Sequence, residues 1–264
     1  MKLDTRLEFA TDLATKAGKF AHEKFKVLDT LTIESKGHHD LVSEADRDTE
    51  TLIRDAINAA YPDDGIVGEE HGRKYGTSGF DWIIDPIDGT ANYLSGIPHW
   101  CVVIACAHEG LPVIGVIRDP NTDETFTASK GHGSHVNGKV MRIADGTTLT
   151  AGSIATGASG RSDREQAAAL VREILINDGM YFRSASGALM LAYVASGRLL
   201  GYVEDHMNSW DCFAALLMIT EAGGRHQTLD PDKSLENGTM LVAGNTDIYP
   251  ILASIAERAF KPKA

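Results

Sequence analysis

The sequence predicts a fold that mixes α-helices and β-strands. Apolar residues recur every three or four positions along residues 3–25, which is typical of an amphipathic helix. Two apolar stretches, residues 100–108 and 111–118, are joined through Glu109-Gly110 and predict a hairpin of long strands. Helical and strand patterns then interleave along the chain without the strict alternation of a parallel βαβ fold.

The first half of the chain is expected to hold a second helix and several shorter strands. The second helix is predicted at residues 43–60, where Ser43 and Asp46 form a capping-box pair and Tyr61-Pro62 stops the helix. Further strands are expected at residues 66–67, 82–84 and 125–128.

The second half is expected to be richer in helices. Apolar periodicity predicts helices at residues 164–177, 187–195, 210–222 and 248–260, and strands at 200–203 and 240–243. No internal repeat or linker divides the chain. A single domain over residues 1–264 is therefore expected, with two tightly joined lobes and a boundary near 140–150 as the alternative.

Composition and charge favour a soluble enzyme. The chain has 264 residues, of which 43% are hydrophobic and 23% charged. Its longest apolar run, residues 101–107, is far shorter than the ~20 residues of a membrane span. Charged residues interrupt the N-terminal segment, so no signal peptide is expected. A net charge of −12 opposes direct nucleic-acid binding. Three cysteines without a CxxC pair predict buried, reduced thiols in a cytoplasmic protein.

The most informative motif is DPIDGT at residues 85–90, directly after the apolar residues 82–84. Asp-Pro and Asp-Gly each favour a turn, so the strand is expected to stop there. Such a turn would point Asp85 and Asp88 into one pocket. Paired carboxylates suit Mg²⁺, which binds one or two carboxylates together with substrate phosphate.

Further acids are expected near this turn. Glu69 follows the short apolar strand at residues 66–67, so it is expected at the same edge of the sheet. Asp211 lies at the start of a helix, where a negative charge is favoured. Asp46 lies at the start of the second helix. Together these acids supply oxygens for two or three Mg²⁺ ions.

These motifs resemble the inositol monophosphatase family of magnesium-dependent, lithium-sensitive phosphatases. The matching segments are Gly68-Glu69-Glu70, residues 85–90 with Asn92, and Trp210-Asp211 followed by residues 221–224. The resemblance runs from residues 40–46 to the last helix. It implies an α+β fold, a layered αβαβα sandwich like that of the fructose-1,6-bisphosphatases, and a homodimer.

The resemblance also implies the site residues. The metal ligands would be Glu69, Asp85, the carbonyl of Ile87, Asp88 and Asp211, with Asp46 reaching a third metal through water. The catalytic residues would be Glu69, Thr90 and Asp46. The substrate would contact Asp88, Gly89, Thr90, Ala188, Glu204 and Asp211.

The roles of these groups follow the chemistry of a phosphate monoester, which repels nucleophiles and needs its charge neutralised and water aligned. Thr90 would help Glu69 to polarise the attacking water, and the backbone amides of Gly89 and Thr90 would hold the phosphate. The haloacid-dehalogenase class is excluded. Its nucleophilic aspartate lies two residues before the second acid, and the residue two before Asp88 here is Pro86.

In inositol-specific members of this family a glutamate near the Trp-Asp motif binds ring hydroxyls, and Glu204 lies at the matching position. The resemblance therefore implies a phosphorylated polyol as substrate, with myo-inositol 1-phosphate as the first expectation. The resemblance also implies a backbone contact near Ala188, where Ser186-Gly187-Ala188 permits the match to the family to shift by one residue. Residues 205–209 and Met190 depart from the family pattern on the alcohol side, so histidinol phosphate, fructose 1,6-bisphosphate, nucleotide 3′-phosphates and NADP stay open. A reading of another class is a regulatory protein of the extragenic-suppressor type, which acts through protein partners.

Overall fold

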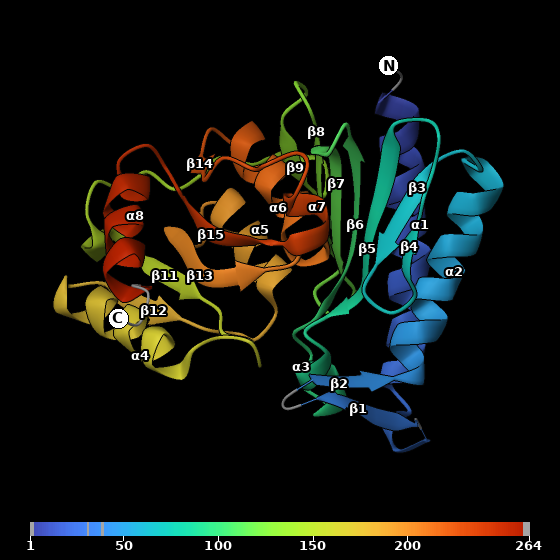
Figure 1. Ribbon diagram of the computed structural model, residues 1–264, viewed down its shortest axis with the longest axis horizontal. Helices are drawn as coiled ribbons and strands as arrows, with labels where there is room; N and C mark the ends of the chain where they lie inside the picture. The colour runs from blue at the N-terminus through green and yellow to red at the C-terminus, as the bar shows by residue number, and fades with distance from the viewer. Residues whose placement is uncertain (1–2, 31, 38–39, 261–264) are drawn as a thin grey trace.

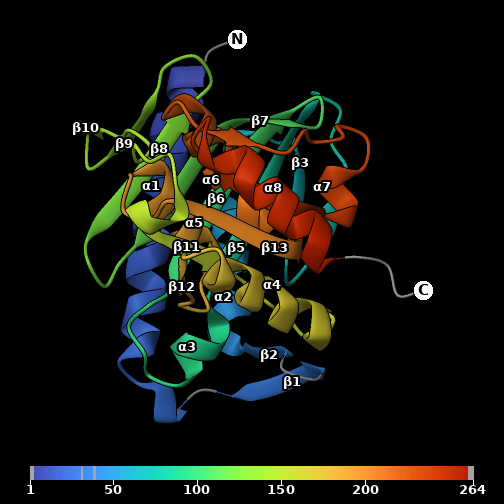
Figure 2. The ribbon, with the colours of Figure 1, turned by 90° about the vertical axis from the view of Figure 1, so that its left-hand side faces the viewer.

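The computed structural model describes residues 3–30, 32–37 and 40–260, and its elements form five layers (Figure 1). The first layer contains α1 (Leu3–Phe25) and α2 (Glu44–Ala60). The third contains α5 (Gly187–Ala195) and α6 (Ser209–Glu221). The fifth contains α4 (Arg164–Ile176) and α8 (Ile248–Ala259), which Figure 2 shows in front of the second sheet. The two sheets lie between these helix layers, so the αβαβα sandwich is confirmed.

The larger sheet has eight strands in the order β10-β9-β8-β7-β6-β5-β3-β4. Its strands are β3 (Gly65–Gly68), β4 (Gly72–Lys74), β5 (Phe80–Asp88), β6 (Cys101–His108), β7 (Leu111–Asp119), β8 (Glu124–Ser129), β9 (Ser134–Val136) and β10 (Lys139–Val140). Neighbouring strands are antiparallel except β3 and β5, which run parallel. The carboxyl ends of β3 and β5 therefore meet at one edge.

The smaller sheet has five strands in the order β12-β11-β13-β15-β14. Its strands are β11 (Ser153–Thr156), β12 (Met180–Phe182), β13 (Gly201–Met207), β14 (Arg225–His226) and β15 (Thr239–Gly244). A separate hairpin pairs β1 (Ile33–Gly37) with β2 (Asp40–Ser43). This hairpin lies beside the short helix α3 (Thr90–Leu94) in both views, and α7 (Ser234–Asn237) precedes β15.

The continuous apolar run of β6 is explained by helices on both faces of its sheet. Cys101, Val103, Ala105 and Ala107 pack with α5 and α6 in the central core. The residues between them, from Val102 to Cys106, pack with α1 and α2. A strand that buries both of its faces has no polar face, which is why the alternation of a half-exposed strand is absent here.

Most predicted elements are confirmed, with two kinds of difference. Every predicted helix is present and ends within a residue or so of its expected limits. The strand predicted at residues 200–203 was too short, because β13 continues through the polar residues 204–206 to Met207. The elements that the sequence did not predict are β1, β2, β4, β9, β10, β11, β12, β14, α3 and α7.

The three cysteines are buried and free, as predicted. Across the described ranges, none of the helices combines the length and the apolar character needed to cross a membrane.

Helix α6 approaches the larger sheet closely at one glycine. A Cβ atom on Gly115 of β7 would lie 2.5 Å from the carbonyl oxygen of Ala214 and 2.8 Å from its Cα. Neither contact can be relieved by a side-chain rotation, since both atoms belong to the backbone. Gly115 therefore allows α6 to lie against the sheet, and it sets the position of Asp211 in the first turn of that helix.

We predict that Gly115→Ala lowers the free energy of unfolding by about 1–3 kcal/mol, because the added methyl group overpacks the contact between β7 and α6. Urea unfolding measures the change. Gly152→Ala is the matched control, since Gly152 is extended, with φ 176°, and its Cβ would lie 3.5 Å from Leu200 Cβ. Equal stabilities for the two variants would contradict the packing argument.

Candidate metal and substrate site

A β-bulge aims Asp85 and Asp88 toward the same site. In a regular strand, residues three apart point to opposite faces. Here Asp85 pairs with Val103 and Asp88 pairs with Cys101, so three residue steps on β5 oppose two on β6. The extra residue turns Asp88 to the side of Asp85. The prediction that the strand stops before Asp85 was wrong, because β5 continues through the bulge to Asp88.

The backbone around Asp85 is held by its own carboxylate. Asp85 Oδ1 accepts a hydrogen bond from the Ile87 amide at 3.0 Å, the local bond that favours an Asx turn. Pro86 lies inside the irregular part of the strand and has no amide hydrogen to contribute to the ladder. The Asp-Pro pair therefore produces a bulge within a paired strand in place of the sharp turn expected from sequence.

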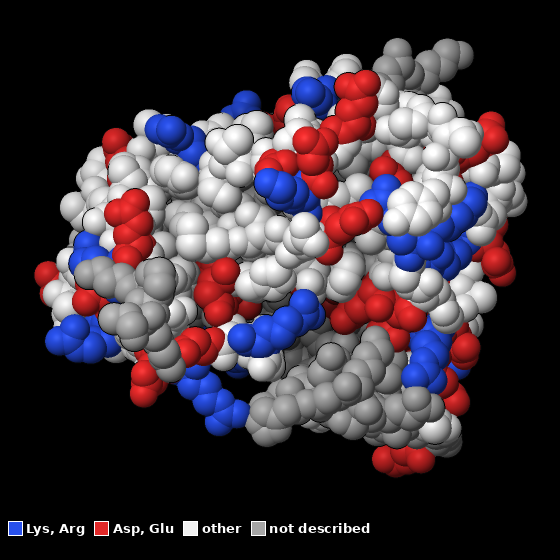
Figure 3. All heavy atoms as spheres, viewed as in Figure 1, with Lys and Arg blue, Asp and Glu red and all other residues white. Residues whose placement is uncertain are grey.

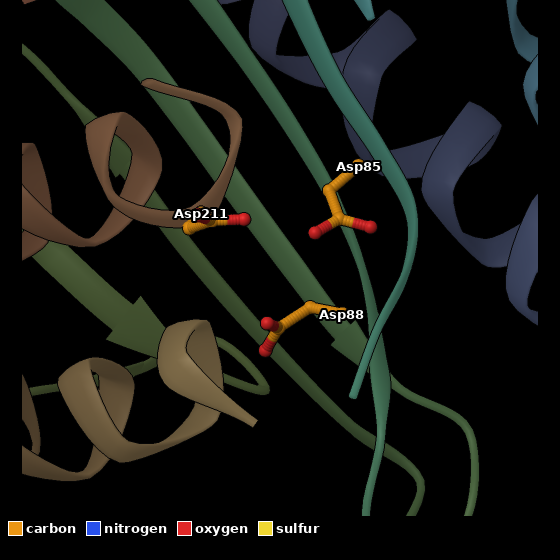
Figure 4. A group of neighbouring side chains, drawn as sticks. All are labelled: Asp85, Asp88 and Asp211. Carbon is orange, nitrogen blue, oxygen red and sulfur yellow. The ribbon is translucent and has the colours of Figure 1, made fainter. Parts of the chain in front are cut away.

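Asp211 reaches the site from the first turn of α6. Its Oδ2 accepts hydrogen bonds from the Asn208 amide at 3.1 Å and from Asn208 Nδ2 at 3.3 Å, which completes a capping box at the start of the helix. Figure 4 shows that the carboxylates of Asp85, Asp88 and Asp211 converge from β5 and α6. Each offers an oxygen that lies within 4.8 Å of the other two.

Asp88 also contacts a helix N-terminus, that of α5. Its Oδ2 accepts hydrogen bonds from the Ser186 hydroxyl and from the Ala188 amide at 2.9 Å, and its Oδ1 accepts one from the Gly187 amide at 3.2 Å. Oδ2 also accepts from the Cys101 thiol at 3.6 Å, whereas Oδ1 accepts from Gly187 alone among these donors, so Oδ1 keeps an acceptor position for a further ligand. Asp88 is thus fixed in place by the protein before any ligand arrives.

The electrostatics of the three aspartates suit a divalent cation. Burial raises the pKa of Asp85 well above its usual range, and the negative charges of Glu69 and Asp88 raise it further. Burial and the charge of Asp88 raise the pKa of Asp211 to about 7. These three carboxylates, of which Asp85 and Asp88 are buried and Asp211 is half-buried, repel one another and need protons or a cation to balance them. Their oxygen-only donor set fits Mg²⁺ or a similar hard cation.

Glu69 lies beside this group, at the carboxyl end of β3. Gly68 pairs with Ile84 of β5, and the Glu69 amide donates to the Ile84 carbonyl at 3.3 Å, so Glu69 is placed next to Asp85. The expected placement of Glu69 and Asp85 at one sheet edge is therefore present. Glu69 is not part of the group in which all ligand oxygens lie within 4.8 Å of one another. Its role as a metal ligand stays a prediction.

Asp46 and Thr90 lie together on another side of the site. Asp46 Oδ2 accepts from the Ser43 amide at 2.9 Å and from the Ser43 hydroxyl at 2.6 Å, so the predicted capping box is confirmed. Thr90 Oγ1 lies 3.4 Å from Asp46 Oδ1 and donates to the Ile87 carbonyl at 3.1 Å. Burial raises the pKa of Asp46 to about 6. Thr90 and Asp46, two of the three residues expected to be catalytic, are thus in contact, and their catalytic roles stay predictions.

Gly89 connects β5 to α3 in a conformation that favours glycine. Its φ is +96°, and a Cβ would lie 3.2 Å from both Ser186 Cβ and the His99 carbonyl oxygen. The turn carrying residues 89–90 is consequently packed against the segment before α5.

A cavity of about 550 Å³ opens beside Asp88 and Asp211, within the size range of small-molecule sites. Glu204 lines it and accepts a hydrogen bond from the Tyr202 hydroxyl. Burial raises the pKa of Glu204 to about 8. Ala188 is fully buried with its amide bonded to Asp88, while Ala185 and Gly187 line the cavity. A substrate contact at Ala188 itself stays a prediction.

Sequence reasoning missed several residues of this site. Three arginines, Arg161, Arg164 and Arg183, line the cavity. Residues 157–162 are rich in glycine and serine, which is typical of a loop and does not indicate a function.

Glu50 was also missed, although it holds the loop that follows β3. It is a fully buried residue of α2 whose carboxylate accepts from the Glu70 amide at 2.7 Å, the His71 amide at 3.2 Å and Arg54 Nε at 2.6 Å. A Cβ on Gly68 would lie 2.1 Å from Glu50 Oε1, so this carboxylate packs directly on the backbone before Glu69. Glu50 thereby fixes the course of the chain at Glu69.

We predict that Glu50→Gln lowers Mg²⁺ affinity by about 10- to 100-fold and destabilises the fold by about 3–5 kcal/mol, because Arg54 loses its buried counter-charge and the loop loses an acceptor. Calorimetric titration and urea unfolding measure the two effects. Glu23→Gln is the control, since Glu23 forms an exposed pair with Lys26. An unchanged Mg²⁺ affinity in Glu50→Gln would contradict the positioning role.

We predict that the metal-free protein loses thermal stability between about pH 4 and pH 7, from the unfolded to the folded pKa, because carboxyls with raised pKa values favour the folded state only while protonated. The folded pKa values of Asp46 and Asp211, about 6 and about 7, place the loss in this window. Added Mg²⁺ should restore stability most at pH 8, as measured by thermal melts with chelator or Mg²⁺. Asp211→Asn should flatten the metal-free profile, and an equally steep profile would refute the assignment.

Comparisons with known proteins agree with this geometry. Residues 2–260 match the Inositol monophosphatase family. The chain is 37% identical over 252 residues to an inositol-1-monophosphatase of Rhizobium meliloti, covering 94% of each protein. It is 38% identical over 263 residues to the Nus factor SuhB of Xylella fastidiosa, covering 95% of each.

A solved structure shows the same fold. The extragenic suppressor protein suhB of Bartonella henselae superimposes with a TM-score of 0.90 at 33% identity, covering 96% of this chain and 99% of that chain. The whole-length family match, the αβαβα layers and the acidic cluster agree, and this chain belongs to the inositol monophosphatase family.

Proposed function

We propose that this protein hydrolyses a small phosphate monoester with Mg²⁺ bound among Asp85, Asp88 and Asp211, and that myo-inositol 1-phosphate is the first substrate to test. The observation that carries the proposal is the group of three converging carboxylates, two of which, Asp88 and Asp211, line a cavity of about 550 Å³. Membership of the inositol monophosphatase family supports a phosphatase of this kind.

In this proposal the bound Mg²⁺ neutralises the phosphate and lowers the pKa of a bound water. The chain supplies the surrounding order. Asp85 and Asp88 are held by the bulge and by α5, and Asp211 by its capping box. The remaining proposed metal ligands are Glu69 and the Ile87 carbonyl.

Thr90 and Glu69 would hold the attacking water. Asp46 lies 3.4 Å from the Thr90 hydroxyl and accounts for a fixed orientation of that group. The phosphate would lie against the amides of Gly89 and Thr90, and Glu204 would bond hydroxyl groups of the alcohol. Water attacks phosphorus directly in this scheme, so neither a serine nor a cysteine forms a phosphoenzyme.

The test is phosphate release, with and without Mg²⁺, from myo-inositol 1-phosphate, histidinol phosphate, fructose 1,6-bisphosphate, 3′-phosphoadenosine 5′-phosphate and NADP. We predict that Asp85→Asn lowers kcat/KM by at least about 100-fold, because it changes a ligand at the centre of the acidic group. Glu204→Gln should cost about 10-fold, since it affects only the alcohol. Equal losses would refute the division of roles, and activity independent of Mg²⁺ would refute the function.

A second candidate function is a role through protein partners, which the names Nus factor SuhB and extragenic suppressor protein suhB of two relatives favour. A homodimeric assembly is a separate proposal, which rests on the family resemblance. The Asp85→Asn variant separates the two functions, because a cellular phenotype that survives the loss of turnover would assign it to partner binding. We further infer that residues 1–264 form one domain, since α5 and α6 share a core with both sheets.

A further inference from the structure

One wall of the cavity is formed by the loop between β11 and α4. Gly157, Ala158, Ser159, Gly160, Arg161, Ser162 and Arg164 line the cavity from this side. Residues of β13 and of the turn before α6 face them, among them Glu204, His206 and Asn208. The cavity thus has an acidic part at Asp88 and Asp211 and a second end lined by the loop, and the two adjoin where Arg161 contacts Asn208.

The loop is joined to the segment at residues 205–209, where the sequence departs from the family pattern. Ser162 Oγ donates to Asp205 Oδ1 at 2.7 Å, and an Arg161 guanidinium nitrogen donates to Asn208 Oδ1 at 2.9 Å. Asn208 is also the residue that caps α6 together with Asp211. The departure therefore supplies partners for the loop, and it connects Arg161 to the residue beside a proposed metal ligand.

The second end of the cavity is positively charged. Arg161, Arg164 and Arg183 all line it. Arg161 and Arg183 donate to the neutral oxygens of Asn208 and Ala158, and among the described residues neither forms an ion pair with a carboxylate. The positive charge of Arg161 partly offsets the burial that raises the pKa of Asp211, so the two groups lie within electrostatic reach.

The positive charge of these arginines contrasts with the net charge of the chain, which is −12. Figure 3 shows acidic and basic side chains on the same face, with one basic cluster over β4 and the neighbouring part of α2. Guanidinium groups bind phosphate and carboxylate groups through paired N–H donors. A neutral polyol would leave Arg161 and Arg183 facing no anion once its phosphate had bound at the acidic end.

We propose that Arg161 and Arg183, with Arg164, form an anion subsite on the alcohol side, so that the preferred substrate is a phosphate monoester carrying a second anionic group. This inference rests on the proposed phosphatase function. A phosphate or a carboxylate satisfies the same chemistry, because both present oxygens to a guanidinium group. The arginines act as specificity-determining residues, while the aspartates bind the reacting phosphate through the cation.

The experiment compares kcat/KM within two substrate pairs that differ by one anionic group. Fructose 1,6-bisphosphate is compared with fructose 1-phosphate, and 3-phosphoglycerate with glycerol 3-phosphate. We expect the doubly anionic member of at least one pair to be preferred by about 10- to 100-fold, the range of a charged hydrogen bond. Preference in the first pair alone assigns a phosphate subsite, and preference in the second alone assigns a carboxylate subsite.

Arg161→Gln and Arg183→Gln should each lower this preference by about 10-fold, mainly through KM of the doubly anionic substrate. Arg172→Gln is the matched control, because Arg172 lies on α4 with 70% of its side chain exposed and does not line the cavity. Its preference ratio should equal that of the unmodified protein.

The outcomes separate the two proposals. Mg²⁺-dependent release with no preference in either pair, or a preference unaffected by both arginine variants, would overturn the anion subsite and leave the phosphatase function standing. Absence of Mg²⁺-dependent release from every compound would overturn the phosphatase function and the subsite with it.

Discussion

The site depends on carboxylates that lie at helix N-termini. Asp46 and Asp211 each complete a capping box, at α2 and α6, and Asp88 accepts the first amides of α5. The partial positive charge of a helix N-terminus offsets part of the cost of burying an acid. The same hydrogen bonds to backbone amides also fix the orientation of each carboxylate. The convergence of three helix starts on the end of β5 therefore both builds the acidic group and holds it together.

This arrangement requires unusually close packing around the site. Gly115 lets α6 lie against β7, and Gly89 lets the turn after β5 lie against the start of α5. On the opposite side, Glu50 packs on the backbone of Gly68 and holds the next loop through two amides. At these contacts glycine lets the helices approach the neighbouring backbone closely, where a larger side chain would keep them apart. The acids are held near one another despite their mutual repulsion.

The two ends of the cavity are built from different materials. The acidic end comes from β5, α5 and α6, whose residues are buried in the central core. The other end comes from an exposed loop and its hydrogen bonds to Asp205 of β13 and to Asn208 in the turn after it. Loops change more readily than packed elements. Related proteins can therefore share the reaction at the acidic residues and differ in the pocket for the alcohol. This explains why the family resemblance indicates the chemistry better than the substrate.

The sequence alone determined the helices and the identity of the acids. Amphipathic periodicity and caps are local, so helices such as residues 187–195 were predicted at their observed limits. The DPIDGT motif identified Asp85 and Asp88 by spacing. The short strands were different, because segments such as Ser153–Thr156 and Met180–Phe182 are strands through pairing with residues far away in the sequence.

Tertiary structure alone decided the direction and surroundings of those acids. The bulge depends on the register of β5 against β6, and the contacts of Glu50 with Glu70 and of Arg161 with Asn208 join residues 20 and 47 positions apart. No local pattern encodes such pairs, since the partner's position is set by the packing of the whole chain. The sequence therefore determined which groups could react, and the packed fold decided how they face one another.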